Sequence, residues 1–446
     1  MEERRKIRKR LINITVPIFI EGLLFMLLGM TDTVMLSRYS DNAVASVGVV
    51  NQVFNMVILI FSVTTLGTSV LCSQYTGAGN SNKMTQVVGV SLIFNLVLGL
   101  ATSLFLIFGG EILLELVKLD PELMSDGIRY LEWVGGFAFL QSISLTISAI
   151  LRATNRGKYS MMVTMVINIV NIIGNYLLIF GHLGLPAMGV EGAAIATTIS
   201  RLIAVVILLY ILFKYVVPSF SFSQFKPFPF DELKKLLHIG APAATEQISY
   251  STSQVVVTMF ANMMSIEAVT TRTYATNIAM LTYLFAMAVA LGNSILVGQL
   301  IGEKRKDDAY RVCLDSLKRA MIVTGIIAGI VAASGTMIMG FLTENPNIIA
   351  IGATILMIDF ILEFGRTINM TMVFALRSTG DARFSVYLGL FSMWVFAVGL
   401  SYVLGVHWGY GVIGIWIAFT VDECFRAVIL LRRWHSKKWM ERDLIK

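Results

Sequence analysis

The chain has few charged residues. Asp, Glu, Lys and Arg make up 14% of its 446 residues, whereas hydrophobic residues make up 56% and the mean hydropathy is +0.75. A soluble domain carries about 25% charged residues, which keep its surface in contact with water. This scarcity of charge excludes a set of water-soluble domains, and with it a soluble enzyme, a nucleic-acid-binding module and a disordered scaffold.

Cysteine and histidine are scarce as well, at three and four residues. The cysteines are too few and too scattered for a disulfide framework. No two histidines have the spacing of a helical zinc motif, and no nucleophile–base set can be assembled from them. We therefore predict no metal site, no cofactor and no enzymatic activity.

Long apolar runs are abundant. A run of about 20 apolar residues is long enough to cross a bilayer as a helix. The runs predict an all-α membrane protein with twelve transmembrane helices, at 12–36, 42–71, 84–110, 127–151, 160–181, 190–213, 236–262, 267–298, 312–342, 348–376, 384–405 and 411–431.

The distribution of Lys and Arg predicts the orientation of these helices. If the basic N-terminus is cytoplasmic, the outer side holds only Arg38, Lys118 and Arg129, and the inner segments hold most of the other basic residues. Cytoplasmic loops carry such an excess of positive charge. We predict an integral protein of the plasma membrane with both termini in the cytoplasm.

Two halves of the sequence resemble each other. Matching segments recur 225 residues apart, as Pro17 and Pro242 do. Near the ends of the two halves the separation becomes 222 residues. The matches are Pro17-Ile-Phe-Ile-Glu21 with Pro242-Ala-Ala-Thr-Glu246, Leu151-Arg152 with Leu376-Arg377, Tyr159-Ser160 with Phe384-Ser385, and Gly189-Val-Glu-Gly192 with Gly411-Val-Ile-Gly414. We interpret them as an internal repeat.

Each repeat holds six predicted helices, so both copies enter the membrane in the same direction. The expected organisation is an N-terminal six-helix lobe at 1–213, a cytoplasmic linker at 214–235 and a C-terminal six-helix lobe at 236–446. Two pseudo-symmetric lobes facing a central cavity are typical of an alternating-access transporter. A channel more often forms from several chains around one pore, and we expect this protein to be a monomer.

Two carboxylates lie in the first predicted helix. Glu21 and Asp32 are 11 residues apart, which places them on one helix face, about 16 Å apart along the axis. The predicted helices 12–36 and 42–71 contain no basic residue, and Arg38 lies just beyond the first one near its outer end, so both carboxylates are expected to lack a counter-charge. A charged group inside the membrane is a functional candidate, and a carboxyl group in a low dielectric is suited to exchange a proton.

Amides and a hydroxyl lie in the fifth and sixth predicted helices. Asn168, Asn171 and Asn175 have the spacing i, i+3, i+7, so they share one helix face. They fit two functions equally well, either holding helices together or joining a proton or sodium network. Thr197 lies in a run of small residues where helix backbones approach closely, so packing is the safer interpretation there.

The second half is more heavily charged. Glu246 repeats Glu21, but the position equivalent to Asp32 is Val257, so one half is expected to bind the coupling ion and the other the substrate. Acidic and basic residues also lie three or four positions apart, which favours structural or gating ion pairs over substrate ligands. These residues are Asp359, Glu363 and Arg366 in one helix, and Asp422, Glu423 and Arg426 in another.

Four segments together resemble the multidrug and toxic compound extrusion (MATE) family over essentially the full length. They are Met30-Thr-Asp32-Thr-Val-Met35-Leu-Ser, Asn171-Ile-Ile-Gly-Asn175, Gly298-Gln299 with Gly302, and Leu376-Arg377-Ser-Thr-Gly380-Asp381. The resemblance implies an antiporter that exports amphipathic organic cations in exchange for protons or sodium. It also implies that Asp32 is the coupling residue.

The chain departs from the family at two positions. Asn175 stands where one proton-coupled branch has an aspartate, and Tyr250 stands where the sodium-linked branch has a glutamate. The coupling ion is therefore left open between proton and sodium.

These observations assign provisional functions to the candidate residues. Asp32, Asn171, Asn175 and Thr197 are the predicted ion site, and Glu21, Glu246 and Tyr250 the predicted substrate site. The expected partners are small amphipathic cations and membrane lipid, without nucleic acid. The alternative is a lipid-linked oligosaccharide flippase of related topology, which would favour a strongly basic cavity to bind pyrophosphate, whereas the buried charges here are mixed.

Overall fold

The computed structural model describes residues 2–218, 220–221, 225–442 and 444–445, and these residues form helices joined by short loops. Residues 219 and 222–224 of the predicted linker lie outside the described residues. The longer helices are α1 (Glu2–Ser37), α2 (Asp41–Gly77), α3 (Ser81–Leu116), α4 (Pro121–Gly136), α5 (Ala138–Ala153), α6 (Gly157–Phe180), α7 (Gly189–Ile211), α8 (Phe230–Met264), α9 (Ile266–Gly302), α10 (Lys306–Ala333), α11 (Gly335–Leu342), α12 (Pro346–Ser378), α13 (Ala382–Ser392) and α14 (Gly411–His435). Helix α7 continues as the π-helical segment η1 (Leu212–Val216), and α13 continues as η3 (Met393–His407).

Most of these helices are suited to a bilayer. Within the described residues, nine helices are long and apolar enough to cross a membrane, and the pair α4 and α5 makes a tenth if it is one span. Helices α8 and α14 are also long, at 35 and 25 residues, but they carry more polar side chains. Together these helices confirm the prediction of an all-α membrane protein.

Two predicted helices are broken. The predicted helix 127–151 is a pair, α4 and α5, that bends by 46° at Phe137. Two glycines, Gly135 and Gly136, precede the bend, and adjacent small residues are a common cause of helix kinks. The predicted helix 312–342 is likewise divided, because α10 ends at Ala333 and α11 begins at Gly335.

The chain forms two units, and each includes a short piece of the other half of the sequence. One unit comprises Val16–Ala241, and the other comprises Met1–Thr15 with Pro242–Lys446. We call them the first unit and the second unit. The N-terminal turns of α1 belong to the second unit and the rest of α1 to the first, and for α8 the assignment is reversed. The boundary lies next to Pro17 in α1 and at Pro242 in α8. We call these N-terminal turns the opening turns.

Close backbone contacts attach these opening turns. In the first unit, a Cβ added at Gly240 of α8 would lie 1.7 Å from the Val63 carbonyl oxygen of α2. In the second unit, a Cβ added at Gly292 of α9 would lie 2.3 Å from Oγ1 of Thr15 in α1. Small residues permit such approaches between helices in membranes. The two contacts join corresponding helix pairs of the repeat, since 15 + 225 = 240 and 67 + 225 = 292, but Gly240 meets Val63, one turn before Gly67, and Gly67 itself packs against Leu236.

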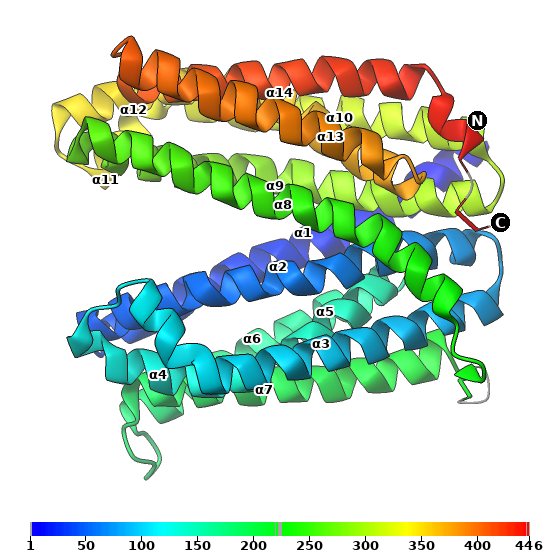
Figure 1. Cartoon of the computed structure of the whole chain (residues 1–446), viewed down its shortest axis with the longest axis horizontal. Coiled ribbons are helices and arrows are strands. Elements are labelled where there is room, and N and C mark those ends of the chain that lie inside the picture. Colours follow the sequence, from blue (N-terminus) through cyan, green and yellow to red (C-terminus); the bar gives the residue numbers. More distant parts are fainter. Residues whose placement is uncertain (1, 219, 222–224, 443, 446) are drawn as a thin grey trace. The chain divides into compact units, whose positions relative to one another are not determined.

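Within the second unit, α12 packs against α9, α10 and α14, as the yellow, green and red ribbons of Figure 1 show. Within the first unit, α6 packs on α7, and α3 packs on α2, α4 and α5. The polar side chains described next come from these packed helices and from α1 and α8.

Candidate ion and substrate sites

The four residues of the predicted ion site lie together in the first unit. Asn175 donates a hydrogen bond of 2.6 Å to Oδ1 of Asp32 and another of 3.0 Å to Oδ1 of Asn171. Asn171 in turn donates to Oγ1 of Thr197 over 3.2 Å. A continuous hydrogen-bonded chain therefore connects α1, α6 and α7. The Oδ1 atom of Asn175 is buried and has no hydrogen-bond partner among the described residues.

Two further side chains surround this network, Arg201 of α7 and Tyr130 of α4. Both lie close enough to Asp32 to interact with it electrostatically. The Arg201 guanidinium lies 4.7 Å from the centre of the Phe54 ring, a cation–π contact. Asp32 is therefore near an arginine, but the described residues contain no ion pair that involves it. The Asp32 carboxylate accepts one hydrogen bond from the Asn175 amide. It also lies near the Arg201 guanidinium, which packs on the Phe54 ring.

Glu21 has a different environment, and the expectation that it lacks a counter-charge is wrong. Nη1 of Arg152 in α5 lies 2.9 and 3.0 Å from its two carboxylate oxygens, and Ser160 donates a third hydrogen bond of 2.9 Å. Glu21 is only 4% exposed. The partner lies 131 residues along the chain, so the composition of the first two helices could not reveal it.

Glu246 repeats this arrangement in the second unit. Its Oε2 atom accepts a hydrogen bond of 2.8 Å from Arg377 at the end of α12, and the separation along the chain is again 131 residues. Gly389 leaves room for the carboxylate, because a Cβ added there would lie 3.0 Å from Oε1 of Glu246. Both repeat-related glutamates are thus neutralised by an arginine of their own unit. Their part in substrate binding stays a prediction.

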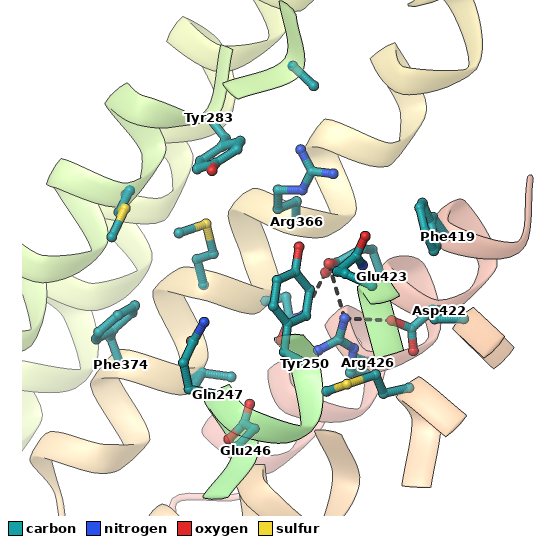
Figure 2. Close-up of a pocket in the computed structure, with 18 of the residues that line it drawn as sticks. Glu246, Gln247, Tyr250, Tyr283, Arg366, Phe374, Phe419, Asp422, Glu423 and Arg426 are labelled. Carbon is teal, nitrogen blue, oxygen red and sulfur yellow. Dashed lines mark hydrogen bonds and ion pairs between the residues drawn. The ribbon is translucent and has the colours of Figure 1, made fainter. Parts of the chain in front are cut away.

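A cavity of about 330 Å³ opens in the second unit, next to this ion pair. Figure 2 shows Tyr250, Glu423 and Arg426 gathered at its centre, with Phe374 and Phe419 on its walls. The lining also includes the methionines at positions 287, 370 and 393. The walls therefore combine flexible apolar side chains with charged groups, a composition suited to varied amphipathic molecules.

The charged groups of the cavity are mostly compensated by one another. Arg426 lies 2.6 Å from a carboxylate oxygen of Asp422 and 3.0 Å from one of Glu423, and Figure 2 marks both contacts. Asn369 donates a hydrogen bond of 2.6 Å to the other oxygen of Glu423. Ser392 donates one to Asp422. Two carboxylates share one guanidinium here, so the cluster is net negative.

A second cluster lies one helix away. Glu363 and Arg366 of α12 form an ion pair, and Arg366 lines the cavity beside Tyr283. Asp359 accepts a hydrogen bond of 3.0 Å from the Trp416 indole. Asp359 and Glu363 stand behind the wall of the cavity, whereas Arg366, Glu423 and Arg426 line it. Whether these pairs act as a gate stays a prediction.

Sequence reasoning missed four of the important partners. Arg152 and Arg377 were noticed only as a repeated pair, although both lie 131 residues after a repeated glutamate. Arg201 is a single arginine inside an apolar run, which is itself a signal of function in a membrane helix. Tyr130 offered no signal, because one tyrosine in an apolar run is ordinary.

The long apolar helices and buried polar clusters fit a membrane transporter, and the family that matches the chain is one of transporters and not of enzymes. The model of the MatE family matches the chain twice, over residues 17–177 and 242–403. The two matches begin at Pro17 and Pro242, which confirms the repeat and its separation of 225 residues. The chain belongs to the MATE family.

Individual relatives cover nearly the whole chain. It is 39% identical to the uncharacterized transporter YisQ of Bacillus subtilis, over 97% of this chain and 95% of that protein. It is 29% identical to a probable multidrug resistance protein NorM of Thermotoga maritima, over 100% and 96%. A crystal structure of MATE in the bent conformation superimposes with a TM-score of 0.89 at 21% identity, covering 97% and 95% of the two chains.

Proposed function

We propose that this protein is a secondary-active antiporter that exports amphipathic organic cations in exchange for protons or sodium by alternating access. The observation that carries the proposal is the hydrogen-bonded chain from Asp32 through Asn175 and Asn171 to Thr197. A carboxylate within a membrane span costs free energy, so it is a candidate for a function. Here it is held by an amide instead of being locked in an ion pair, so it is free to exchange a cation.

The groups around Asp32 suit either coupling ion. The carboxylate can take up a proton, and the carboxylate together with the unpartnered Oδ1 of Asn175 offers oxygen ligands to a hard cation. Arg201 repels a cation that enters and stabilises the empty carboxylate, which favours release. The ion gradient drives the proposed exchange, and the membrane potential adds about 2.3 kcal/mol per 100 mV for each net positive charge that enters per cycle.

The cavity of the second unit is the proposed place for the organic cation. Tyr250 and the phenylalanines provide aromatic faces, which attract cations, and the net negative cluster at Glu423 provides the counter-charge. The NorM relative is a probable multidrug resistance protein, and a cation of this kind is a common drug class. Three arginines and three carboxylates line the cavity, so it is not the strongly basic site that a pyrophosphate-linked cargo requires.

The proposal includes a location and an assembly state. The distribution of Lys and Arg supports insertion in the plasma membrane with both termini in the cytoplasm. Both copies of the repeat lie within one chain, which thus supplies the two lobes of an alternating-access transporter, and we propose a monomer as the working unit.

Counter-transport in proteoliposomes tests this function. Ethidium movement is followed by fluorescence while a pH gradient and a sodium gradient are imposed separately. We expect uphill movement with one of the two gradients, and Asp32→Asn should reduce it to the level of empty vesicles, because an amide cannot exchange a cation.

Asp41→Asn is the matched control, since it makes the same chemical change at an exposed position at the start of α2. This variant should keep its transport rate. Gradient-driven transport that persists in Asp32→Asn would contradict the ion site. Ethidium movement that never runs uphill under either gradient would contradict antiport.

A further inference from the structure

A basic hollow in the second unit has no part in the proposed transport cycle. It has a volume of about 520 Å³ and lies between the opening turns of α1 and the first half of α10. Its charged lining consists of Arg5, Arg8, Arg311 and Arg319, with Asp308 and Asp315. This end of the unit is the one that the distribution of Lys and Arg predicts to be cytoplasmic.

The four arginines are poorly compensated. Asp308 is already bound by Arg305 over 2.7 Å, which leaves Asp315 as the one remaining acid in the lining. In the described part of the chain, none of the four arginines forms an ion pair or a side-chain hydrogen bond, and all four are exposed. Four guanidinium groups around one hollow repel each other, so an anion with several oxygens would stabilise them.

An apolar hollow continues from the basic one. It has a volume of about 570 Å³ and lies between α10 and α12, and Leu314 lines both hollows. Its α10 wall includes Ile322 and Ile326, which are 54% and 58% exposed. Its α12 wall is made by Phe360 and Phe364, whose rings pack edge to face at 5.1 Å. Exposed apolar surface in a membrane span faces hydrocarbon.

The combined length of the two hollows matches one leaflet of a bilayer. Arg311 and Ile326 are 15 residues apart on α10, which is about 22 Å along a helix axis. One leaflet, half of a bilayer with its headgroup region, is also about 20–22 Å thick. A charged end and an apolar end at this separation have the dimensions of a phospholipid.

We propose that this groove binds an anionic glycerophospholipid of the cytoplasmic leaflet. The phosphate lies among Arg5, Arg8, Arg311 and Arg319, and an acyl chain lies against Leu314, Ile322 and the two phenylalanines. Basic pockets at the cytoplasmic ends of membrane helices bind such headgroups. A soluble phosphate would use the arginines but not the apolar hollow, and a zwitterionic lipid would bring its own positive charge to the arginines. The bound lipid would tie the opening turns of α1 to α10.

Retention of lipid by the purified, full-length protein tests the proposal. The protein is delipidated in an uncharged detergent and titrated with dioleoyl phosphatidylglycerol or dioleoyl phosphatidylcholine, and bound lipid is counted by native mass spectrometry. We expect selective retention of phosphatidylglycerol. Arg311→Gln/Arg319→Gln should weaken it about 25-fold, because each basic residue near an anionic headgroup contributes about fivefold.

The matched control is Lys9→Gln/Lys234→Gln, which removes the same charge from exposed positions outside the groove. It should retain phosphatidylglycerol like the unaltered protein. Equal retention of the two lipids, or unchanged retention in the arginine variant, would overturn the proposal. Displacement of the lipid by excess inorganic phosphate would instead assign a soluble anion site. The lipid comparison and the phosphate competition use the unaltered protein, so they decide the question even if the arginine variant unfolds.

Discussion

The two units share their ion pairs but not their polar sites. Glu21 with Arg152 in the first unit corresponds to Glu246 with Arg377 in the second, residue by residue, at a separation of 225. Asp32 has no such counterpart, since position 257 is a valine buried in an apolar cluster, and position 400, equivalent to Asn175, is a leucine. The repeat therefore preserves the two buried ion pairs, whereas the polar residues near Asp32 are found in one copy only.

The clearest divergence is a reversal of charge. Arg201 of α7 corresponds to Glu423 of α14 at the separation of 222 that holds along these helices. Arg201 lies near a carboxylate that is proposed to exchange a small cation, whereas Glu423 lines a cavity proposed to hold an organic one. The same place in the fold thus carries a positive charge beside the proposed ion site, where it favours release of the cation, and a negative charge in the proposed substrate cavity, where it attracts one.

Breaking the shared ion pairs should give the largest effect, and the same effect in both units. Arg152→Gln or Arg377→Gln leaves a buried glutamate without its counter-charge, which costs about 3–5 kcal/mol. We expect each variant to lose about 3 kcal/mol or more in the free energy of unfolding, measured in mixed micelles with increasing SDS.

Removing both partners provides the control. Glu21→Gln/Arg152→Gln leaves no unpaired charge, so it should cost less than the sum of the single changes. The corresponding double change at Glu246 and Arg377 should behave alike. A large effect in one unit and none in the other would contradict the structural equivalence of the two pairs.

The helices and the repeat were predictable because both depend on short-range features of the sequence. The length of an apolar run and a fixed separation between Pro17 and Pro242 need no knowledge of packing. The exchange of opening turns between the units was not predictable, since α1 is one continuous helix and nothing local marks Thr15 as its point of change.

The ion site was predictable in part. The i, i+4 spacing of Asn171 and Asn175 placed both amides on one face, and the structure brings Asp32 to that face. The partners of Glu21 and Glu246 were not found, because they come from another helix whose position depends on tertiary packing. The equal separation of 131 residues in both halves was the signal that could have identified them.

Two equivalent glycines, one in each unit, allow a second comparison with a smaller expected loss of stability. A Cβ added at Gly192 would lie 2.5 Å from the carbonyl oxygen of Leu178, and one added at Gly414 would lie 2.7 Å from the carbonyl carbon of Leu404. Both obstacles are backbone, so neither can rotate away. Alanine at either position should lower the free energy of unfolding by about 1–3 kcal/mol.

Gly29→Ala is the control for these variants, because no atom lies within 4 Å of a Cβ added there. It should be neutral or stabilising, since alanine favours a helix more than glycine does. If Gly29→Ala were as harmful as Gly192→Ala, the cost would not come from the contact between helices.

Asn175 tests a feature that only the first unit has. Asn175→Ala removes the hydrogen bond that fixes Asp32, and a bond to a charged group contributes roughly 1.5–3 kcal/mol. We expect gradient-driven ethidium transport to fall about tenfold at unchanged expression. Asn168→Ala makes the same change two turns earlier, where the amide donates to the backbone oxygen of Leu24, and it should keep the transport rate. Equal losses in both variants would indicate damage to α6 rather than to the ion site.

An exposed ion pair should give the smallest effect. It tests whether the loss predicted for Arg152→Gln comes from the burial of the pair or from opposite charges alone. Arg129 and Glu191 of the first unit lie 3.4 Å apart, and the arginine side chain is 61% exposed. The second unit has Thr354 and Ile413 at the equivalent positions, so this pair is not shared. Exposed pairs contribute about 0–1 kcal/mol, because water already solvates both charges. Arg129→Gln should therefore change the free energy of unfolding by less than about 1 kcal/mol in the same SDS titration. A loss as large as that of Arg152→Gln would mean that any pair of opposite charges stabilises this fold, and burial would no longer explain why the repeat has kept two of them.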